Sequence, residues 1–387
     1  MEQTRPAEGI WASYSSISQH RGCPQKWYYQ RILNLGRLEP ETAPALEFGN
    51  WWHALMAADS LARGRVHGTL KYAPEWITAT DSWLFSGAVV NPEDILAGSE
   101  KFWEQLSEEV KAQWVDYLGE SLPDRLAGAY VRWLDEWAED REYERPLAVE
   151  VGWGRDLGDT GARLVGYVDE VFLDAKRNLV VVRDHKTMKT LGTQTTQDDL
   201  MDAQLHLYAW GAAPQIEEWG VGPVRATSYD RIRSVKATTP RLTNAGSLSK
   251  QVTQFDLRTY LEWVAEGQEY PGTKKDGSGA GVYELDEAVV EHLSSPAWRS
   301  AWHQRTLTPV NVNVIRSHLR ATTDTVLDMV RTKEIVESRG EAPRNPGSGC
   351  RWCDFAKLCQ AQLIGGPDGE YDYAAMGLVQ SERKRRA

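Results

Sequence analysis

The sequence predicts an α/β protein, of the mixed α+β kind, in which a small sheet is flanked along the chain by helical segments. Alternating apolar and polar residues, the pattern of a half-buried strand, start at residue 146 and recur to about residue 235. Apolar residues at helical spacing dominate before and after that stretch. The composition is that of a globular protein, with 41% hydrophobic and 26% charged residues. The 387 residues are enough for two or three packed regions.

Residues 1–60 are expected to form an N-terminal helical segment. Ser15 and Ser16 are residue types that favour the N-cap of a helix, and Pro24 suits the first turn of a second helix. An alanine-rich stretch at residues 54–62 predicts a further helix. The segment also contains the first cysteine of the chain and one candidate active-site histidine.

Residues 61–145 are predicted to form a helical insertion. Two apolar stripes at helical spacing support this prediction. Their members are Trp103, Leu106, Val110 and Trp114 in the first stripe, and Leu126, Tyr130, Trp133, Leu134 and Trp137 in the second. Residues 100–150 contain 14 acidic and 6 basic residues, a net charge of −8. Most of the acidic excess of the chain therefore lies in or beside the insertion.

Residues 146–240 are expected to contain the sheet. The predicted strands are 146–157, 163–174, 178–186 and, after a helix near residues 200–208, 226–235. The third strand contains a continuous apolar run, as buried strands do. Short breaks with glycine or aspartate join the first three strands, so we expect an antiparallel meander.

The C-terminal third of the chain falls into three parts. Residues 241–345 are mostly helical by their apolar spacing, and a loop rich in proline and glycine ends them. A cysteine cluster follows at residues 346–366. Residues 367–387 form a tail with four consecutive bases at residues 383–386.

Three carboxylates and a lysine converge on the predicted sheet. Asp184 and Lys186 end the third strand, and the strand period of two puts both side chains on one face. Asp169 lies near the end of the neighbouring strand, and Glu150 lies in the first. By themselves, Asp184 and Lys186 are most simply an ion pair at a strand end. Burying three carboxylates is costly, however, and a bound Mg²⁺ or Mn²⁺ would remove that cost because carboxylate oxygens suit these ions.

A lysine beside such a cation has a plausible chemical role. It can orient or help to deprotonate a water molecule and can stabilise the charge that builds on a phosphate, while the cation lowers the pKa of bound water. That combination performs phosphodiester hydrolysis. Two other patterns, Gly49-x-x-x-His53 and Gln204-x-x-x-Tyr208, are ordinary helix features when taken alone. They gain significance only beside the carboxylates.

The four cysteines of the chain form one possible ligand set. Cys350, Cys353 and Cys359 lie close together near the C-terminus, and Cys23 lies more than three hundred residues earlier. Four thiolates can hold a tetrahedral zinc ion or an iron–sulfur cluster. Zinc sites more often use two short cysteine pairs, and this chain has one, so an iron–sulfur cluster is favoured. Unligated thiols are the third possibility.

The net charge of −11 argues at first against a nucleic-acid partner. Binding depends on local charge, however, and residues 222–258 carry seven bases and two acids, a net charge of +5. We expect this segment to form a basic side that follows DNA phosphates. No apolar run is long enough for a membrane helix, and the N-terminus has no secretory signal. A cytoplasmic location with reduced thiols is therefore expected.

Taken together, these motifs resemble the PD-(D/E)XK nucleases of the RecB/AddB/Cas4 type, especially the Cas4-like exonucleases of bacteriophages. The resemblance rests on the order of the motifs along the chain. They are Cys23, Gly49-x-x-x-His53, Glu150, Gly166-Tyr167-Val168-Asp169, Asp184-x-Lys186, Gln204-x-x-x-Tyr208 and Cys350-x2-Cys353-x5-Cys359. They run from residue 13 to about residue 365.

The resemblance implies a restriction-endonuclease-like αβββαβ core with large helical insertions and a C-terminal segment stapled by a [4Fe–4S] cluster. It implies a Mg²⁺- or Mn²⁺-dependent DNA exonuclease that prefers single-stranded ends and serves recombination, repair or replication. The metal ligands would be His53, Asp169, Asp184 and the backbone carbonyl of His185. Lys186 would be the catalytic lysine, and Gln204 and Tyr208 would support the active site and contact DNA; Glu150 is a further candidate catalytic residue. The four cysteines would hold the cluster.

Other functions and partners remain open at this point. A different class of protein is a non-catalytic iron–sulfur DNA-binding or scaffold protein of a phage replication or recombination complex. A third possibility is a module whose helical insertion docks a recombinase or helicase. Because the chain has no P-loop sequence, any motor would be another chain. If the chain is encoded by a phage, its location would be the cytoplasm of the bacterial host.

Overall fold

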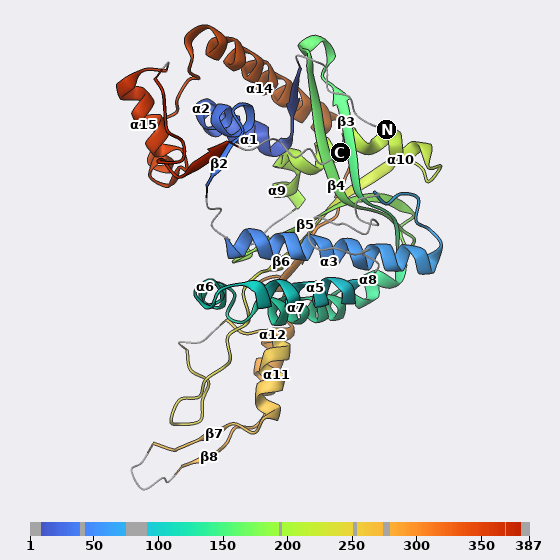
Figure 1. Ribbon diagram of the computed structural model, residues 1–387. Coiled ribbons are helices and arrows are strands. Elements are labelled where there is room, and N and C mark those ends of the chain that lie inside the picture. The colour runs from blue at the N-terminus through green and yellow to red at the C-terminus, as the bar shows by residue number, and fades with distance from the viewer. Residues whose placement is uncertain are drawn as a thin grey trace.

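A mixed sheet of seven strands forms the centre of the computed structural model (Figure 1). The structure describes residues 9–38, 43–74, 91–192, 196–250, 254–273, 279–367 and 369–380. The strands are β1 Ile10–Ala12, β3 Glu144–Asp156, β4 Ala162–Asp174, β5 Leu179–Met188, β6 Val224–Arg233, β9 His303–Arg305 and β10 Thr308–Pro309. The predicted α/β fold class is confirmed.

The first three long strands have the predicted antiparallel order, and the fourth, for which no direction was predicted, joins the same sheet. β3 pairs antiparallel with β4, and β4 pairs antiparallel with β5, so the expected meander is present. β6 then pairs parallel with β5, which requires a crossover. Helices α9 Thr196–Met201 and α10 Ala203–Glu218 provide it. Three strands of two or three residues, β1, β9 and β10, were not predicted because they are too short to show a period.

Helices cover both faces of the sheet. On one face, Leu205 and Leu207 of α10 share a core with Val180 and Val182 of β5 and with Met329 of α14. Helices α1 Tyr14–Gly22 and α14 Val312–Arg339 complete this layer. On the other face, α3 Pro44–His67 lies across the strands, with α5 and α7 stacked beyond it (Figure 1).

The insertion consists of four helices in its described part. They are α5 Pro92–Gln105, α6 Glu108–Leu118, α7 Leu122–Glu136 and α8 Ala138–Tyr143. One prediction was wrong here, because the stripe from Trp103 to Trp114 belongs to two helices. Ser107 accepts a hydrogen bond from the backbone of Val110 and caps a new helix. Similarly, the N-cap of α1 is Ser13 and not Ser15 or Ser16.

The segment after β6 contains more strand than predicted. Helices α11 Leu257–Ala265, α12 Glu287–Ser294 and α13 Pro296–Arg299 surround a small core of Phe255, Tyr260, Trp263 and Leu293. With the hairpin of β7 Glu269–Tyr270 and β8 Gly281–Val282, they form an arm that projects from the rest of the molecule (Figure 1). The chain then returns through β9 and β10 to the edge of the sheet beside β6.

Residues 20–38 and 341–380 lie side by side and form what we call the cysteine lobe. Its elements are α2 Pro24–Trp27, a π-helix at Tyr28–Ile32, β2 Leu35–Arg37, a 3₁₀ turn at Ser348–Trp352, α15 Ala356–Gly365 and β11 Leu378–Gln380. Strands β2 and β11 pair antiparallel. Pro343 accepts a backbone hydrogen bond of 3.0 Å from Gln25, and Tyr29 packs on Phe355. Two described segments that lie more than three hundred residues apart in the sequence therefore share one small core.

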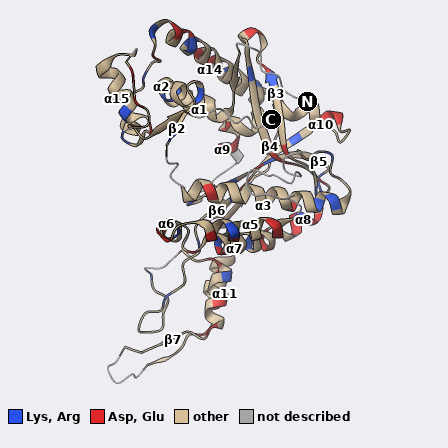
Figure 2. Ribbon diagram, viewed as in Figure 1, with Lys and Arg blue, Asp and Glu red and all other residues tan. Residues whose placement is uncertain are grey.

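The distribution of charge differs from the expectation in one respect (Figure 2). The basic segment 222–258 is not a free basic surface, because several of its bases are buried or paired within the protein. Arg231 lies 2.6 Å from Asp199 and Lys236 lies 2.7 Å from Glu120, and Arg233 is 9% exposed. The bases at residues 383–386 lie outside the described residues. In the described part of the chain, no helix combines the length and hydropathy needed to cross a bilayer.

Candidate active site

The candidate site lies where one edge of β4 is unpaired. β4 pairs with β3 along one edge. The opposite edge pairs with β1 at residues 162–164 and with β5 at residues 170–174. Asp169 falls between these two ladders. Its carboxylate accepts a 2.8 Å hydrogen bond from the backbone N–H of His185, and so replaces a backbone acceptor at this point.

His53, Glu150 and Asp169 come together although they lie on three different elements. One potential ligand atom from each lies within 4.8 Å of the others, and His53 Nδ1 is 3.2 Å from Asp169 Oδ2. A Cβ on Gly49 would lie 3.2 Å from Thr187 Oγ1, so glycine lets α3 approach the end of β5 one turn before His53. Glu150 has a positive φ of 48°, which is uncommon for a residue with a side chain.

Asp184 and Lys186 form a second group beside the first. Lys186 Nζ lies 2.7 Å from Asp184 Oδ2. Gln204 of α10 donates a 3.0 Å hydrogen bond to the other oxygen of Asp184, and its amide nitrogen also lies 3.1 Å from the Tyr208 hydroxyl. The pattern Gln204-x-x-x-Tyr208 thus places one helical turn directly against the carboxylate.

The first group is electrostatically polarised. Burial alone would lower the pKa of His53, but the neighbouring Asp169 carboxylate outweighs burial and raises that pKa to about 9. Burial would in turn raise the pKa of Asp169, but the positive His53 lowers it to about 2. His53 and Asp169 therefore form an ion pair near neutral pH.

The second group combines an acid that is hard to ionise with a lysine that stays protonated. Burial is the main cause that raises the pKa of Asp184 to about 6; Lys186 opposes the rise and Asp169 adds to it. Burial would lower the pKa of Lys186, but Asp184 outweighs burial and raises it. Without a cation, the protonated His53 and Lys186 balance Asp169 and Asp184, and a cation bound here would replace the proton of His53.

The donor atoms fit a hard divalent cation. His53, Glu150 and Asp169 offer one nitrogen and carboxylate oxygens, and Asp184 can add another oxygen, a set that suits Mg²⁺ or Mn²⁺. The His185 side chain is not part of this group. Its ring is buried, 3.5 Å from Asp230 and 3.9 Å from Glu170, which leaves its backbone as the part that meets Asp169.

Asp202 is a residue near the site that sequence reasoning missed. It caps the N-terminus of α10 by accepting a hydrogen bond from the backbone of Gln204. It also accepts bonds of 3.2 Å from the Tyr14 hydroxyl and 2.9 Å from the Tyr229 hydroxyl. Burial and Asp202 together raise the pKa of Tyr14 to about 12. An aspartate just before a helical stretch was the available signal.

The four cysteines lie in the cysteine lobe, and each is a free thiol. The sulfur of Cys359 accepts a hydrogen bond of 3.3 Å from Arg344, and that of Cys350 accepts one of 3.5 Å from the backbone of Gly347. Among the described residues, no cysteine belongs to a set of three ligand atoms within 4.8 Å of one another. The described structure therefore brings together neither the zinc ligands nor the iron–sulfur ligands that the sequence offered as alternatives.

A sheet edge that gathers carboxylates, a histidine and a lysine supported by a glutamine–tyrosine pair defines a metal-dependent nuclease. The sequence matches the PD-(D/E)XK nuclease superfamily over residues 12–360. The chain therefore belongs to that superfamily, as its motifs predicted. A search of the curated proteins finds no match. As a nuclease, the protein acts on DNA.

Proposed function

We propose that the protein is a Mg²⁺- or Mn²⁺-dependent DNA exonuclease that degrades single-stranded ends. One observation carries the proposal. His53, Glu150 and Asp169 meet within 4.8 Å at an open strand edge, and the Asp184–Lys186 pair stands beside them. A protein that only binds DNA would have no need for this costly set of buried charges. By analogy with the proteins that its motifs resemble, it would serve recombination, repair or replication, in the host cytoplasm if a phage encodes it.

Each residue has a proposed role. His53, Glu150, Asp169 and Asp184 hold the cation, with the backbone carbonyl of His185 as a further ligand. The bound cation supplies Lewis-acid polarisation of the phosphate and a water of lowered pKa.

Lys186 is the catalytic lysine in this proposal. It is kept protonated by Asp184, so it stabilises the charge that develops on the phosphate and donates a hydrogen bond to it. Gln204 and Tyr208 fix the orientation of Asp184 through the two contacts of the Gln204 amide.

The cysteine lobe is proposed to bind a [4Fe–4S] cluster through Cys23, Cys350, Cys353 and Cys359. Two of the sulfurs accept N–H hydrogen bonds, as cluster thiolates commonly do. Burial is the main cause that raises the pKa of the Cys353 thiol. A cluster would tie both ends of the chain together.

The same lobe offers a contact for an unpaired DNA strand. Trp352, in the turn between Cys350 and Cys353, is 86% exposed. The neighbouring Arg351, and Lys357 in the following helix, are exposed as well. Bases of a single strand stack on aromatic side chains while cations hold the phosphates. This is our reason to favour single-stranded ends over duplex DNA.

Substitution of the catalytic lysine tests the proposal. Lys186→Ala should reduce Mg²⁺-dependent degradation of end-labelled single-stranded DNA at least about a hundredfold, the usual cost of losing one transition-state contact. Lys176→Ala is the matched control, because Lys176 lies over the Tyr143 ring at the other end of the β4–β5 hairpin. That variant should keep full activity.

Three other outcomes would point away from the proposed mechanism or to a different role of the protein. Degradation that persists in pure Lys186→Ala protein would rule out this catalytic mechanism. DNA binding without cleavage under either cation, in the unsubstituted protein, would favour the non-catalytic scaffold instead. Co-purification of a helicase or recombinase that depends on residues 61–145 would identify the insertion as a docking site.

A further inference from the structure

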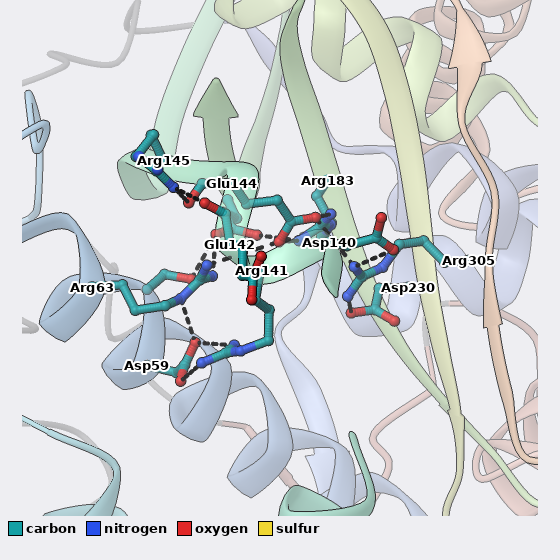
Figure 3. A network of polar contacts seen from close by, with 12 residues as sticks. Asp59, Arg63, Asp140, Arg141, Glu142, Glu144, Arg145, Arg183, Asp230 and Arg305 are labelled. Atoms are coloured by element: carbon teal, nitrogen blue, oxygen red, sulfur yellow. Dashed lines mark hydrogen bonds and ion pairs between the residues drawn. The ribbon is translucent and has the colours of Figure 1, made fainter. Parts of the chain in front are cut away.

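A network of charged side chains, buried or half-buried, joins helix α3, helix α8 and the sheet (Figure 3). It comprises Asp59, Arg63, Arg141, Glu144, Glu170, Arg183, Asp230 and Arg305, all joined by ion pairs of 4.0 Å or less. This set contains four acids and four arginines; at its border Asp140 lies 3.8 Å from Arg305, and the His185 ring lies 3.5 Å from Asp230. None of its members is a proposed ligand or catalytic residue.

Arg183 is at its centre. The side chain is 1% exposed and lies 3.0 Å from Glu170. It also donates two hydrogen bonds to Glu144, one of them at 3.1 Å, and its guanidinium stacks 4.0 Å from the centroid of the Phe172 ring. Figure 3 shows Arg183 beside Glu144, with Arg63 and Asp59 on one side of the network and Asp230 and Arg305 on the other. A planar guanidinium can hold two carboxylates in fixed directions, which an ammonium cannot.

The Arg183–Glu170 ion pair lies directly beside two candidate metal ligands. Glu170 directly follows Asp169 in β4, and Arg183 directly precedes Asp184 in β5. The two are cross-strand partners and form the last rung of the β4–β5 ladder. Beyond that rung the strands carry the candidate metal ligands without backbone pairing between them. The Arg183–Glu170 ion pair therefore holds the two strands together at the last paired residues before Asp169 and Asp184.

The same cluster reaches the other two elements of the site. Ser60 of α3 donates a 2.7 Å hydrogen bond to Glu170 and lies seven residues after His53, on the same face of the helix. Glu144 lies in β3, the strand that carries Glu150. Each element that supplies a candidate ligand thus also supplies one member of the set Ser60, Glu144, Glu170 and Arg183.

From this correspondence we infer that Ser60, Glu144, Glu170 and Arg183 are positioning residues that set the relative placement of the metal ligands, with Arg183 as the common partner. The inference rests on the proposed metal site. Residues that orient ligands from behind typically change metal affinity about 10–100-fold when they are replaced. A network that served stability alone would leave metal affinity unchanged in a variant that still folds.

Direct Mn²⁺ binding tests this role without any measurement of catalysis. Arg183→Lys keeps the positive charge but loses the planar guanidinium that holds two carboxylates. The variant should bind Mn²⁺ more weakly, with a dissociation constant raised about tenfold or more, as measured by electron paramagnetic resonance of the free ion. Ser60→Ala is a milder change and should also raise the Mn²⁺ dissociation constant, but by a smaller factor. It provides a second variant should Arg183→Lys fail to fold.

Arg141→Lys is the matched control. Arg141 belongs to the same network, donates two hydrogen bonds of 2.8 Å to Asp59 and stacks over Trp133. Its partners thus lie on α3 and α7, and not on the strands β4 and β5. Its replacement should lower the melting temperature and leave the Mn²⁺ dissociation constant within about twofold of the original.

The activity of Arg183→Lys should in turn depend on the Mn²⁺ concentration. Saturating Mn²⁺ should restore more nuclease activity to this variant than subsaturating Mn²⁺ does.

Two outcomes would overturn the inference, and they are distinguishable. If Asp169→Asn abolishes Mn²⁺ binding while Arg183→Lys and Ser60→Ala bind as tightly as the original, the metal site stands and the positioning role is wrong. If the unsubstituted protein does not bind Mn²⁺, the proposed metal site and the positioning role both fail.

Discussion

His20 shows how a single buried side chain can make one contact between helices depend on pH. The residue is 5% exposed and its Nε2 lies 2.9 Å from Thr332 Oγ1 of α14. The Thr332 hydroxyl donates its own hydrogen to Asp328, so Nε2 of His20 must be the donor in this contact. The ring also meets Trp27 edge-on. A neutral histidine satisfies this environment, and burial lowers its pKa below the ordinary 6.5.

The sign of the pH effect follows from that shift. Below about pH 6.5 the unfolded chain protonates His20 more readily than the folded chain does, so stability falls as the pH drops and is fully present above that value. The His20→Gln variant cannot titrate at this position. The difference in melting temperature between the original protein and this variant should therefore shrink between pH 7.5 and 5.5. A difference that stays constant across this range would contradict the prediction.

At the scale of elements, the placement of α10 depends on a close approach to β3. A Cβ on Gly211 would lie 2.2 Å from the Trp153 ring, which is much closer than any real contact. Tyr208 meets the same ring edge-on at 5.9 Å. Glycine at this position therefore lets the helix that carries Gln204 and Tyr208 lie directly against the sheet.

Replacing Gly211 by alanine sets two effects against each other. Helix propensity favours alanine by about 1 kcal/mol, but overpacking against a rigid indole ring typically costs about 1–3 kcal/mol. Because the contact would be only 2.2 Å, we expect the clash to outweigh the gain in helix propensity, so that the protein becomes less stable. We expect Gly211→Ala to lower the free energy of unfolding by about 2 kcal/mol and to reduce nuclease activity by displacing Gln204. Chemical denaturation and a nuclease assay measure the two effects.

Gly128 of α7 is the control for this prediction. A Cβ there would lie 3.2 Å from Nη1 of Arg132, a much longer contact than the one at Gly211, although Asp256 and Thr259 hold that guanidinium in place. Gly128→Ala should leave stability unchanged or raise it by up to about 1 kcal/mol. Equal losses in the two alanine variants would show that the clash with Trp153 does not control the position of α10.

Local patterns predicted some elements and not others. The strands over residues 146–186 were predictable because alternation and a continuous apolar run are properties of a few adjacent residues. The helix proposed across Trp103 to Trp114 was wrong because apolar spacing alone does not detect the new N-cap at Ser107. The bases of segment 222–258 were expected at the surface, but their partners, such as Asp199 and Glu120, come from other elements that only the fold brings near.

The candidate site was predictable to a similar extent. The shared face of Asp184 and Lys186 followed from the period of a strand. The meeting of His53 with Asp169 did not follow from any local pattern, because it requires α3 to pack on a sheet formed about a hundred residues later in the sequence. Only the family resemblance indicated it. The positive φ of Glu150 left no signal that we recognised in the sequence.

On the scale of the whole molecule, the cysteine lobe links the two ends of the chain. Cys353→Ser should remove the visible absorption and the bound iron of anaerobically purified protein if the proposed cluster is present. It should also lower the melting temperature and speed proteolysis within both residues 20–38 and 341–380, because the two segments share one core.

Ser348→Ala in the same turn is the matched control and should change neither iron content nor proteolysis. Iron retained at full stoichiometry in Cys353→Ser would contradict the ligand assignment. Zinc in place of iron in freshly prepared anaerobic protein would contradict the nature of the cofactor.

The carboxylate of Asp169 has a consequence for the choice of inactive variant. Because it accepts the backbone N–H of His185, alanine at this position would remove a candidate metal ligand and also leave a strand amide without its acceptor, at a cost of about 1–3 kcal/mol if the amide stays buried. Loss of activity in Asp169→Ala would therefore mix chemistry with local unfolding. Asparagine keeps an acceptor oxygen in place, so Asp169→Asn is the better trap for crystallising the protein with an uncleaved DNA strand.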